Sequence, residues 1–262
     1  MSKNILELFR LDGKKAVVTG ASGGIGGAVA LALAEAGADV ALHYYKNRES
    51  AENVVNTILR TTNKEAFTIQ ADVADYNEVN QMASEINARW GKVDILFNNA
   101  GIGLTVKPEE STKEQWLKVI DVNLNGVFYC AQAFGKIMIE NGGGSIINTG
   151  SMSASIINRP EEVSYSVSKA GVHLMTRGLA ACWAQHNIRV NAIAPGYIAT
   201  EMSLPEMRNR PEWVKKYWTD WTPQGRVAQP EELSGLVVFL ASDASSFMTG
   251  SCVLIDGGFT IY

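Results

Sequence analysis

The stretch KAVVTGASGGIGGAVALALAEAG, residues 15–37, decides the fold. A short β-branched run leads through a glycine-rich turn into an apolar helical pattern that ends at Gly37. The same alternation continues along the chain, with short apolar runs at 39–45, 65–73, 93–98, 144–149, 188–195 and 251–256 between longer amphipathic segments. Nearly continuous apolar strands separated by such helices are typical of a parallel sheet covered on both faces. With right-handed crossovers, this pattern predicts one α/β domain over residues 1–262, a Rossmann-type doubly wound parallel sheet flanked by helices.

Composition and charge exclude several classes of function. The 262 residues carry a formal net charge of −4, and no run of five Lys or Arg residues offers a surface for nucleic acid or an anionic membrane. The N-terminal segment has no long apolar core, so we expect no secretory signal, and no apolar run reaches membrane-spanning length. Cys130, Cys182 and Cys252 are far apart and, like the three histidines, show no metal-ligand spacing. We therefore expect a cytoplasmic protein with reduced thiols and no metal.

The glycine-rich turn has the composition of a phosphate cradle. Gly20, Gly24 and Gly26 follow the first strand directly, and glycine permits close approaches that a Cβ would block. The helix that starts here would point its first N–H groups at an anion. Ser22 could add a hydroxyl, and Ile25 completes the pattern Thr-Gly-x-x-x-Gly-Ile-Gly. A tight strand-to-helix turn without a ligand is the alternative interpretation, because such turns are common.

Tyr165 and Lys169, in EEVSYSVSKAG (161–171), are four residues apart and therefore share one face of a helix. An isolated tyrosine has a pKa of about 10 and exchanges protons poorly at neutral pH. A neighbouring ammonium lowers that pKa, which suits a group that gives or takes a proton while a hydride moves. The pair by itself is also typical of ordinary helix surface, so the surrounding motifs decide between the two interpretations.

Those motifs occur in the order of a known family. With the turn at 19–26, NNAG (98–101), DVNLNG (121–126), INTGSMSA (147–154) and APGYIAT (194–200), the chain resembles the short-chain dehydrogenase/reductase family over essentially its whole length. The resemblance implies that Tyr165 is the general acid or base, and that Lys169 lowers its pKa and holds the nicotinamide ribose. Ser151 would orient the substrate carbonyl, with Ser153 as a rival, and Asn123 would kink its helix and support a proton relay to Lys169.

The resemblance also implies a dinucleotide site. Besides Tyr165 and Lys169, its members would be Gly20, Ser22, Gly24, Ile25, Gly26, Asp72, Val73, Asn99, Ala100, Gly101, Pro195, Gly196, Ile198 and Thr200. Asp72 would lie near the adenine, while the Ile198 backbone and the Thr200 hydroxyl would hold the carboxamide. A helix-flanking cap is the alternative for Asp72.

The end of the second predicted strand bears on the choice of cofactor. An acidic residue there would bind the ribose hydroxyls of NAD and repel the 2′-phosphate of NADP. Tyr44 occupies that position, with His43, Lys46 and Arg48 nearby. Lysine or arginine can pair with a phosphate, so we expect NADP(H) to be preferred and NAD(H) to be an alternative. Exposed charges at a helix start are the structural alternative.

Residues 201–225 correspond to the substrate lid of the family. Trp213, Tyr217, Trp218 and Trp221 could cover the nicotinamide or pack at a subunit interface. GSMSASIINRP (150–160), PGYIATEM (195–202) and TPQGR (222–226) resemble the polyol and ketose branch, which includes sorbose reductases, carbonyl reductases and mannitol, arabinitol and galactitol dehydrogenases. In that branch Asn158 and Arg159 would offer polar contacts to sugar hydroxyls, and the assembly would be a homotetramer. A 3-oxoacyl-thioester reductase and a non-catalytic dinucleotide-binding protein are the alternative functions.

Overall fold

The computed structural model describes residues 4–261, which contain one seven-stranded sheet. Its strands are β1 (Lys15–Val18), β2 (Asp39–Tyr44), β3 (Ala66–Gln70), β4 (Ile95–Asn98), β5 (Gly144–Thr149), β6 (Ile188–Pro195) and β7 (Cys252–Ile255). They lie in the order β3-β2-β1-β4-β5-β6-β7, and every neighbouring pair is parallel. The predicted doubly wound parallel sheet is confirmed.

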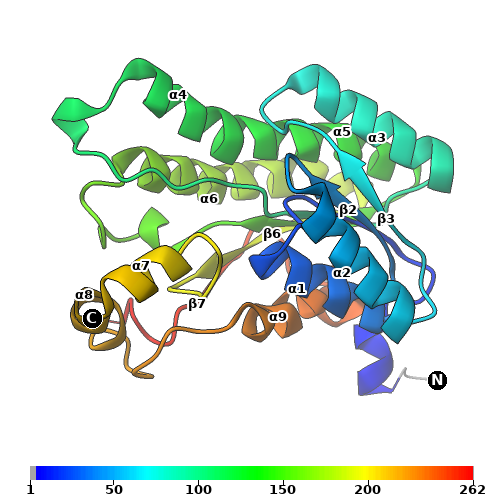
Figure 1. Cartoon of the computed structure of the whole chain (residues 1–262). Helices are drawn as coiled ribbons and strands as arrows, with labels where there is room; N and C mark the ends of the chain where they lie inside the picture. Colours follow the sequence, from blue (N-terminus) through cyan, green and yellow to red (C-terminus); the bar gives the residue numbers. More distant parts are fainter. Residues whose placement is uncertain (1–3, 262) are drawn as a thin grey trace.

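Helices cover both faces of the sheet (Figure 1). They are α1 (Gly24–Glu35), α2 (Arg48–Thr61), α3 (Tyr76–Trp90), α4 (Lys113–Ile120), α5 (Gly126–Glu140), α6 (Val163–Trp183), α7 (Leu204–Asn209), α8 (Pro211–Val214) and α9 (Ser234–Ala241). α1, α2 and α9 pack on one face, and α3, α5 and α6 pack on the other. Because successive strand residues point to opposite faces, Val17 belongs to one buried cluster and Val18 to the other.

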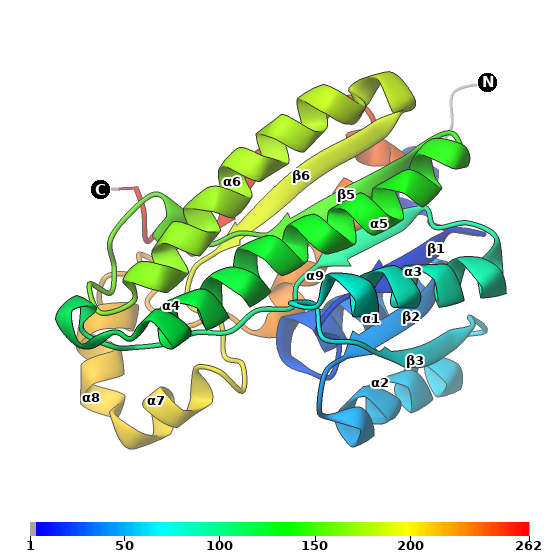
Figure 2. The same cartoon turned by 90° about the horizontal axis from the view of Figure 1, so that it is seen from above.

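The order in which strands are added to the sheet changes side between β1 and β4, which are neighbours in space: β2 and β3 lie on one side of β1, and β4 to β7 lie on the other. In such folds a ligand crevice opens at this switch point, at the carboxyl ends of the strands. The glycine-rich turn after β1 and residues 99–101, 150–154 and 196–200 all leave the sheet at this edge. Figure 2 shows α7 and α8, which belong to the 201–225 segment, at the end towards which β6 runs. The motifs found in the sequence therefore converge on one place.

The helical region before β5 is not one regular α-helix. Between α4 and α5 the backbone makes a π-helical turn over Asp121–Asn125. A π-helical turn contains one residue more than an α-helical turn and bends the helix locally. This turn is the kink that the resemblance implied at Asn123.

Candidate active site

α6 brings Tyr165 and Lys169 together at the carboxyl edge of the sheet. The Lys169 side chain passes inward, where it is only 3% exposed, and its Nζ donates a hydrogen bond to the Thr149 carbonyl at 2.7 Å. The same Nζ lies 5.6 Å from the centre of the Tyr165 ring. Lys169 is therefore buried and held by β5, and Tyr165 beside it is only partly exposed, so the pair is not part of a solvated helix face.

Burial sets the protonation of both groups. It lowers the pKa of Lys169 to about 8, because an ammonium is poorly solvated in the protein interior. It also raises the pKa of Tyr165 to about 12, although a hydrogen bond from Ser151 acts in the opposite direction and the charge of Glu162 adds to the rise. Burial is the largest of these influences on the phenol, and the lowering of the Tyr165 pKa by Lys169 stays a prediction.

The loop after β5 separates the two candidate serines. Ser151 hydrogen-bonds Tyr165, and its Oγ also accepts a hydrogen bond from the Ser153 amide at 3.1 Å. Ser153 instead donates from its Oγ to Oδ1 of Asn158 at 2.8 Å. The geometry therefore pairs Ser151 with Tyr165 and assigns Ser153 to the loop that carries Asn158.

Asn123 is fully buried at the middle of the π-helical turn. Its Oδ1 accepts from the Ile102 amide and its Nδ2 donates to the Ile102 carbonyl, both at 2.8 Å. The same Nδ2 lies 3.3 Å from Oγ of Ser168, which in turn donates to the Tyr165 carbonyl at 2.7 Å. Asn123 thus links the loop after β4 to the helix that carries the reactive pair.

The turn after β1 fits a dinucleotide. A Cβ at Gly26 would lie 2.2 Å from the Gly20 carbonyl oxygen, and Gly20 has a φ of 64°, so both positions require glycine. Helix α1 starts with Gly24, and no side chain caps its first turn, which leaves its N–H groups free for a phosphate. Oγ1 of Thr19 accepts from the amides of Asn99 and Ala100, at 2.9 and 3.0 Å, and so ties the NNAG loop to the cradle.

The adenosine side differs from expectation at His43. Its Nδ1 accepts from the Gly20 amide at 3.1 Å and its Nε2 lies 2.9 Å from the Ala71 carbonyl, so both ring nitrogens are used. Burial lowers the pKa of His43 and favours this neutral form. His43 therefore supports the cradle and is not placed to meet a 2′-phosphate.

The remaining predicted residues of this side lie around the ends of β2 and β3. Tyr44 is buried at the end of β2, and Lys46 is exposed, with its Nζ 5.0 Å from the centre of the Tyr45 ring. Arg48 is also exposed and pairs with Glu52 at 2.6 Å. Oδ1 of Asp72 accepts from the Ala74 amide at 2.9 Å, a turn contact that leaves its other oxygen available, and Val73 follows it, buried.

A cavity of about 370 Å³ opens beside Tyr165. Predicted residues on its wall are Ile25, Ser151, Ser153, Asn158, Arg159, Tyr165, Pro195, Gly196, Ile198, Thr200 and Trp218. Of the four lid aromatics, Trp218 is buried and stacks on Tyr197 with ring centres 4.3 Å apart, whereas Trp221 is 61% exposed. Trp213 packs against Trp218 at 5.9 Å. One aromatic residue of the segment therefore reaches the cavity directly.

Thr105, Glu162, Tyr197 and Glu206 also line the cavity and were not named among the predicted site residues. Nδ2 of Asn158 donates to the Tyr197 hydroxyl at 3.0 Å, and Arg159 binds Glu206 across 47 positions of sequence. Tyr197 lies inside the recognised APGYIAT motif, so its position was a usable signal. Glu162 lies in the stretch 155–162, which was expected to form one wall of the pocket, and Glu206 lies in the predicted lid. Their shared contact with Arg159 was not predictable, because only the folded chain brings the lid to the loop before α6.

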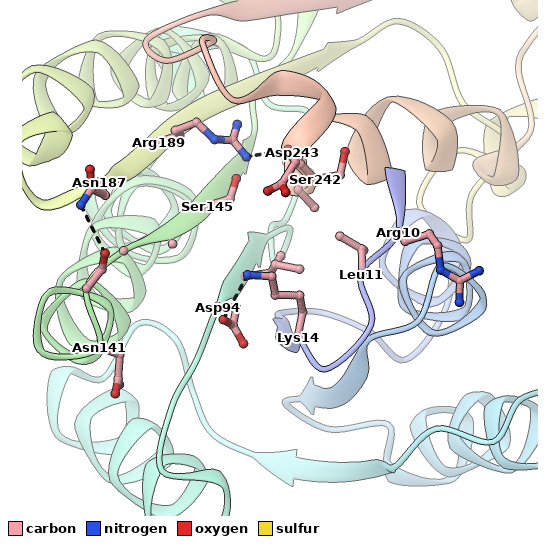
Figure 3. Close-up of a pocket in the computed structure, with 15 residues that line it drawn as sticks. Arg10, Leu11, Lys14, Asp94, Asn141, Ser145, Asn187, Arg189, Ser242 and Asp243 are labelled. Atoms are coloured by element: carbon pink, nitrogen blue, oxygen red, sulfur yellow. Dashed lines mark hydrogen bonds and ion pairs between the residues drawn. The ribbon is translucent and has the colours of Figure 1, made fainter. Parts of the chain in front are cut away.

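A second cavity, of about 300 Å³, lies at the opposite, amino-terminal ends of the strands (Figure 3). Its most buried cation, Arg189, already donates to the carbonyls of Leu240 and Ser242 and to Oγ of Ser245. Asp94 meets Lys14 at 3.6 Å and Lys92 at 2.9 Å. These groups satisfy one another and do not point to a ligand.

The described residues also bear on metal binding and membrane insertion. Over residues 4–261, no three His, Cys, Asp or Glu side chains gather closely enough to hold a metal ion. Within the same residues, no helix has both the length and the apolar character that crossing a bilayer requires.

Comparisons with known proteins agree with this geometry. A family model described as Enoyl-(Acyl carrier protein) reductase matches residues 20–260. The chain is 42% identical to a sorbose reductase of Candida albicans, over 99% of this chain and 92% of that protein, and 46% identical to a galactitol 2-dehydrogenase of Rhizobium johnstonii, over 97% and 98%. A gluconate 5-dehydrogenase from Burkholderia cenocepacia, solved in complex with NADP and tartrate, superimposes with a TM-score of 0.92 at 37% identity, over 99% of this chain and 100% of that one. The chain belongs to the short-chain dehydrogenase/reductase family.

Proposed function

We propose that the protein is an NADP(H)-preferring oxidoreductase that interconverts a ketose, or a related ketone, and the corresponding polyol or secondary alcohol. One observation carries the proposal: Ser151 and Tyr165 line a cavity that Ile25 of the glycine-rich turn also lines, and the buried Lys169 lies beside Tyr165. The names of the sorbose reductase and the galactitol 2-dehydrogenase support the class of substrate.

Asn123, Ser151, Tyr165 and Lys169, the catalytic tetrad of this proposal, each have a role in moving a proton. The dinucleotide supplies or accepts the hydride. Tyr165 gives its proton to the carbonyl oxygen during reduction and takes it back during oxidation, and its raised pKa keeps the phenol protonated for reduction. Ser151 orients the carbonyl through the hydroxyl that also contacts Tyr165. Lys169 places a cation beside the tyrosine, and Asn123 positions the Ile102 backbone for a relay.

The preference for NADP(H) rests on the end of β2. Tyr44 occupies the place of the acid that would repel a 2′-phosphate, and Lys46 and Arg48 are exposed beside it. Arg48 would have to exchange its ion pair with Glu52 for the phosphate, which exposed pairs do at little cost in free energy. NADP in the complex of the Burkholderia enzyme supports this choice, and NAD(H) is the alternative cofactor.

The lid, the assembly and the cellular compartment complete the proposal. Residues 201–225 would open and close over the substrate, with Trp218 as the inner face. A homotetramer would cover exposed apolar side chains such as Phe128 on α5, Leu174 on α6 and Leu254 on β7. The three cysteines are free, which suits the reducing cytoplasm.

Initial rates with purified protein test the proposal. NADPH and NADH would each be offered with sorbose, fructose, xylulose and tagatose, and with an acetoacetyl thioester. Turnover of a ketose with NADPH in preference to NADH supports the proposal. Turnover of the thioester with inert ketoses moves the protein to the 3-oxoacyl-thioester reductases. Equal rates for the parent and Tyr165→Phe would contradict the tyrosine mechanism, whereas NADPH binding without turnover of any of these substrates would favour a non-catalytic dinucleotide-binding protein.

A further inference from the structure

The cavity beside Tyr165 carries an unequal set of charges. Of the described residues that line it, only Arg159, Glu162 and Glu206 are formally charged. Their side chains are 13%, 14% and 24% exposed, so all three are largely removed from water. One guanidinium thus faces two carboxylates, and the wall has an excess of one negative charge when all three are ionised.

These neighbours engage both terminal nitrogens of the Arg159 guanidinium. It binds Glu206 through both terminal nitrogens, Nη1 to Oε2 at 2.9 Å and Nη2 to Oε1 at 2.7 Å. Nη1 also lies 3.1 Å from Oε1 of Glu162, and Nη2 lies 3.4 Å from Oγ1 of Thr105. The group is centred 5.4 Å from the ring of Trp213. Each terminal nitrogen therefore has two partners, and neither is left to receive an anion from the substrate.

We propose that Arg159, Glu162 and Glu206 restrict the substrate to uncharged polyhydroxy ketones and alcohols and exclude sugar acids. The inference rests on the proposed function, because it assumes that a ketose or polyol is the reactant. It adds a choice that the comparisons leave open, since a sorbose reductase and a gluconate 5-dehydrogenase are similar to this chain over nearly the same length.

Electrostatic repulsion and the cost of desolvation both disfavour a substrate that carries a carboxylate. A substrate carboxylate that enters the cavity loses its hydration, and it recovers that free energy only if an unpaired cation or several donors meet it. Here it would meet two carboxylates, and the only lining cation is paired with both of them among the described residues. The nearest other ammonium, on Lys169, lies behind Tyr165 and donates to the Thr149 carbonyl.

Substrate hydroxyls have no such difficulty. A hydroxyl can donate to the carboxylate oxygens of Glu162 or Glu206, which keep lone pairs beyond those used by Arg159, and it brings no charge with it. A site built for neutral groups and lined with fixed charge therefore selects by repelling the charged analogue.

L-Sorbose and 5-keto-D-gluconate provide the test, because they share every carbon centre and differ in one terminal group, CH₂OH in the first and carboxylate in the second. The parent enzyme, Glu206→Gln and a control, Glu161→Gln, would be compared for kcat/KM with both substrates and NADPH. Glu161 is exposed, adjoins Glu162 in sequence and does not line the cavity, so its variant makes the same change of charge outside the site. The ratio of kcat/KM for the two substrates is compared between variants, because the different open-chain fractions of the two substrates affect every variant equally.

We expect the parent to favour sorbose by about 10-fold or more. Glu206→Gln should reduce that ratio by about 10-fold, because it removes one negative charge and frees part of Arg159. Glu161→Gln should leave the ratio within about twofold of the parent, since an exposed charge is screened.

The results distinguish a failure of this inference from a failure of the proposed function. Equal or better reduction of 5-keto-D-gluconate by the parent overturns the inference and leaves the proposed function standing. A ratio that is the same in Glu206→Gln and in the parent also overturns it. Reduction of an acetoacetyl thioester with both sugars inert overturns the proposed function itself.

Discussion

Replacing Lys169 with methionine should stabilise the protein at neutral pH while abolishing turnover. Methionine keeps the length and apolar stem of the side chain but removes the ammonium, which is 3% exposed. Burial lowers the pKa of Lys169 from 10.5 to about 8, so the folded protein holds this proton less firmly than the unfolded chain does. Between these two pH values the unfolded chain binds more protons, and the free energy of unfolding of the parent rises with pH.

The size of the effect follows from the two pKa values. The shift from 10.5 to about 8 destabilises the folded parent by about 3 kcal/mol at pH 7 and by about 1 kcal/mol at pH 10. The variant also loses the hydrogen bond from Nζ to the Thr149 carbonyl, a loss of about 1 to 2 kcal/mol that changes little with pH. Lys169→Met should therefore unfold with a free energy about 1 to 2 kcal/mol higher than the parent at pH 7, and the advantage should disappear by pH 10.

Urea unfolding followed by tryptophan fluorescence, at several pH values between 7 and 10, measures this difference; the chain has six tryptophans. Lys118→Met is the matched control, because Lys118 is an exposed lysine in the last turn of α4 and its loss should give no comparable gain or pH dependence. A variant less stable than the parent at pH 7, or a difference that does not change with pH, would refute the reasoning about the buried ammonium.

Four further substitutions test the site. Tyr165→Phe should lower kcat/KM for ketone reduction by about 100-fold or more, since the proton donor is lost, while NADPH fluorescence titration should show unchanged binding; a fall in binding alone would contradict this role. Lys46→Ala, and more weakly Arg48→Ala because Arg48 is shared with Glu52, should raise KM for NADPH by about 10-fold and leave that for NADH unchanged; an equal rise for both cofactors would argue against a 2′-phosphate contact. Gly26→Ala should abolish dinucleotide binding, because the new Cβ would lie 2.2 Å from the Gly20 carbonyl oxygen, and retained binding in calorimetry would show that the turn is not the cradle.

Most of the fold could be predicted because the central strands are buried on both faces and carry apolar runs, such as Ile95–Phe97 in β4 and Ile146–Ile147 in β5. The tetrad was readable for a different reason: Tyr165 and Lys169 are neighbours within one helix turn, and short motifs at the ends of β4 and β5 accompany them. Patterns formed by residues that are close in the sequence can be recognised without the structure.

The charges of the cavity were not readable, because Arg159 and Glu206 meet through the docking of α7 on the loop before α6. The position of Arg159 was noted, but its partners were not, and those partners decide what the cavity can accept. The rise in the pKa of Tyr165 on burial was not predictable either, since spacing reveals a nearby lysine but not how much water reaches the phenol.

The π-helical turn at Asp121–Asn125 has a consequence for how this chain can change. Each residue of an α-helix advances the side-chain direction by about 100°, so deleting one residue here would restore an unbroken helix and turn Asn123 away from the Ile102 backbone. A deletion of one codon within the π-helical turn would make the helix regular, but it would break the link between the loop after β4 and α6. Such a deletion would therefore be selected against, because a regular helix here would remove the contacts of Asn123 on which the site depends.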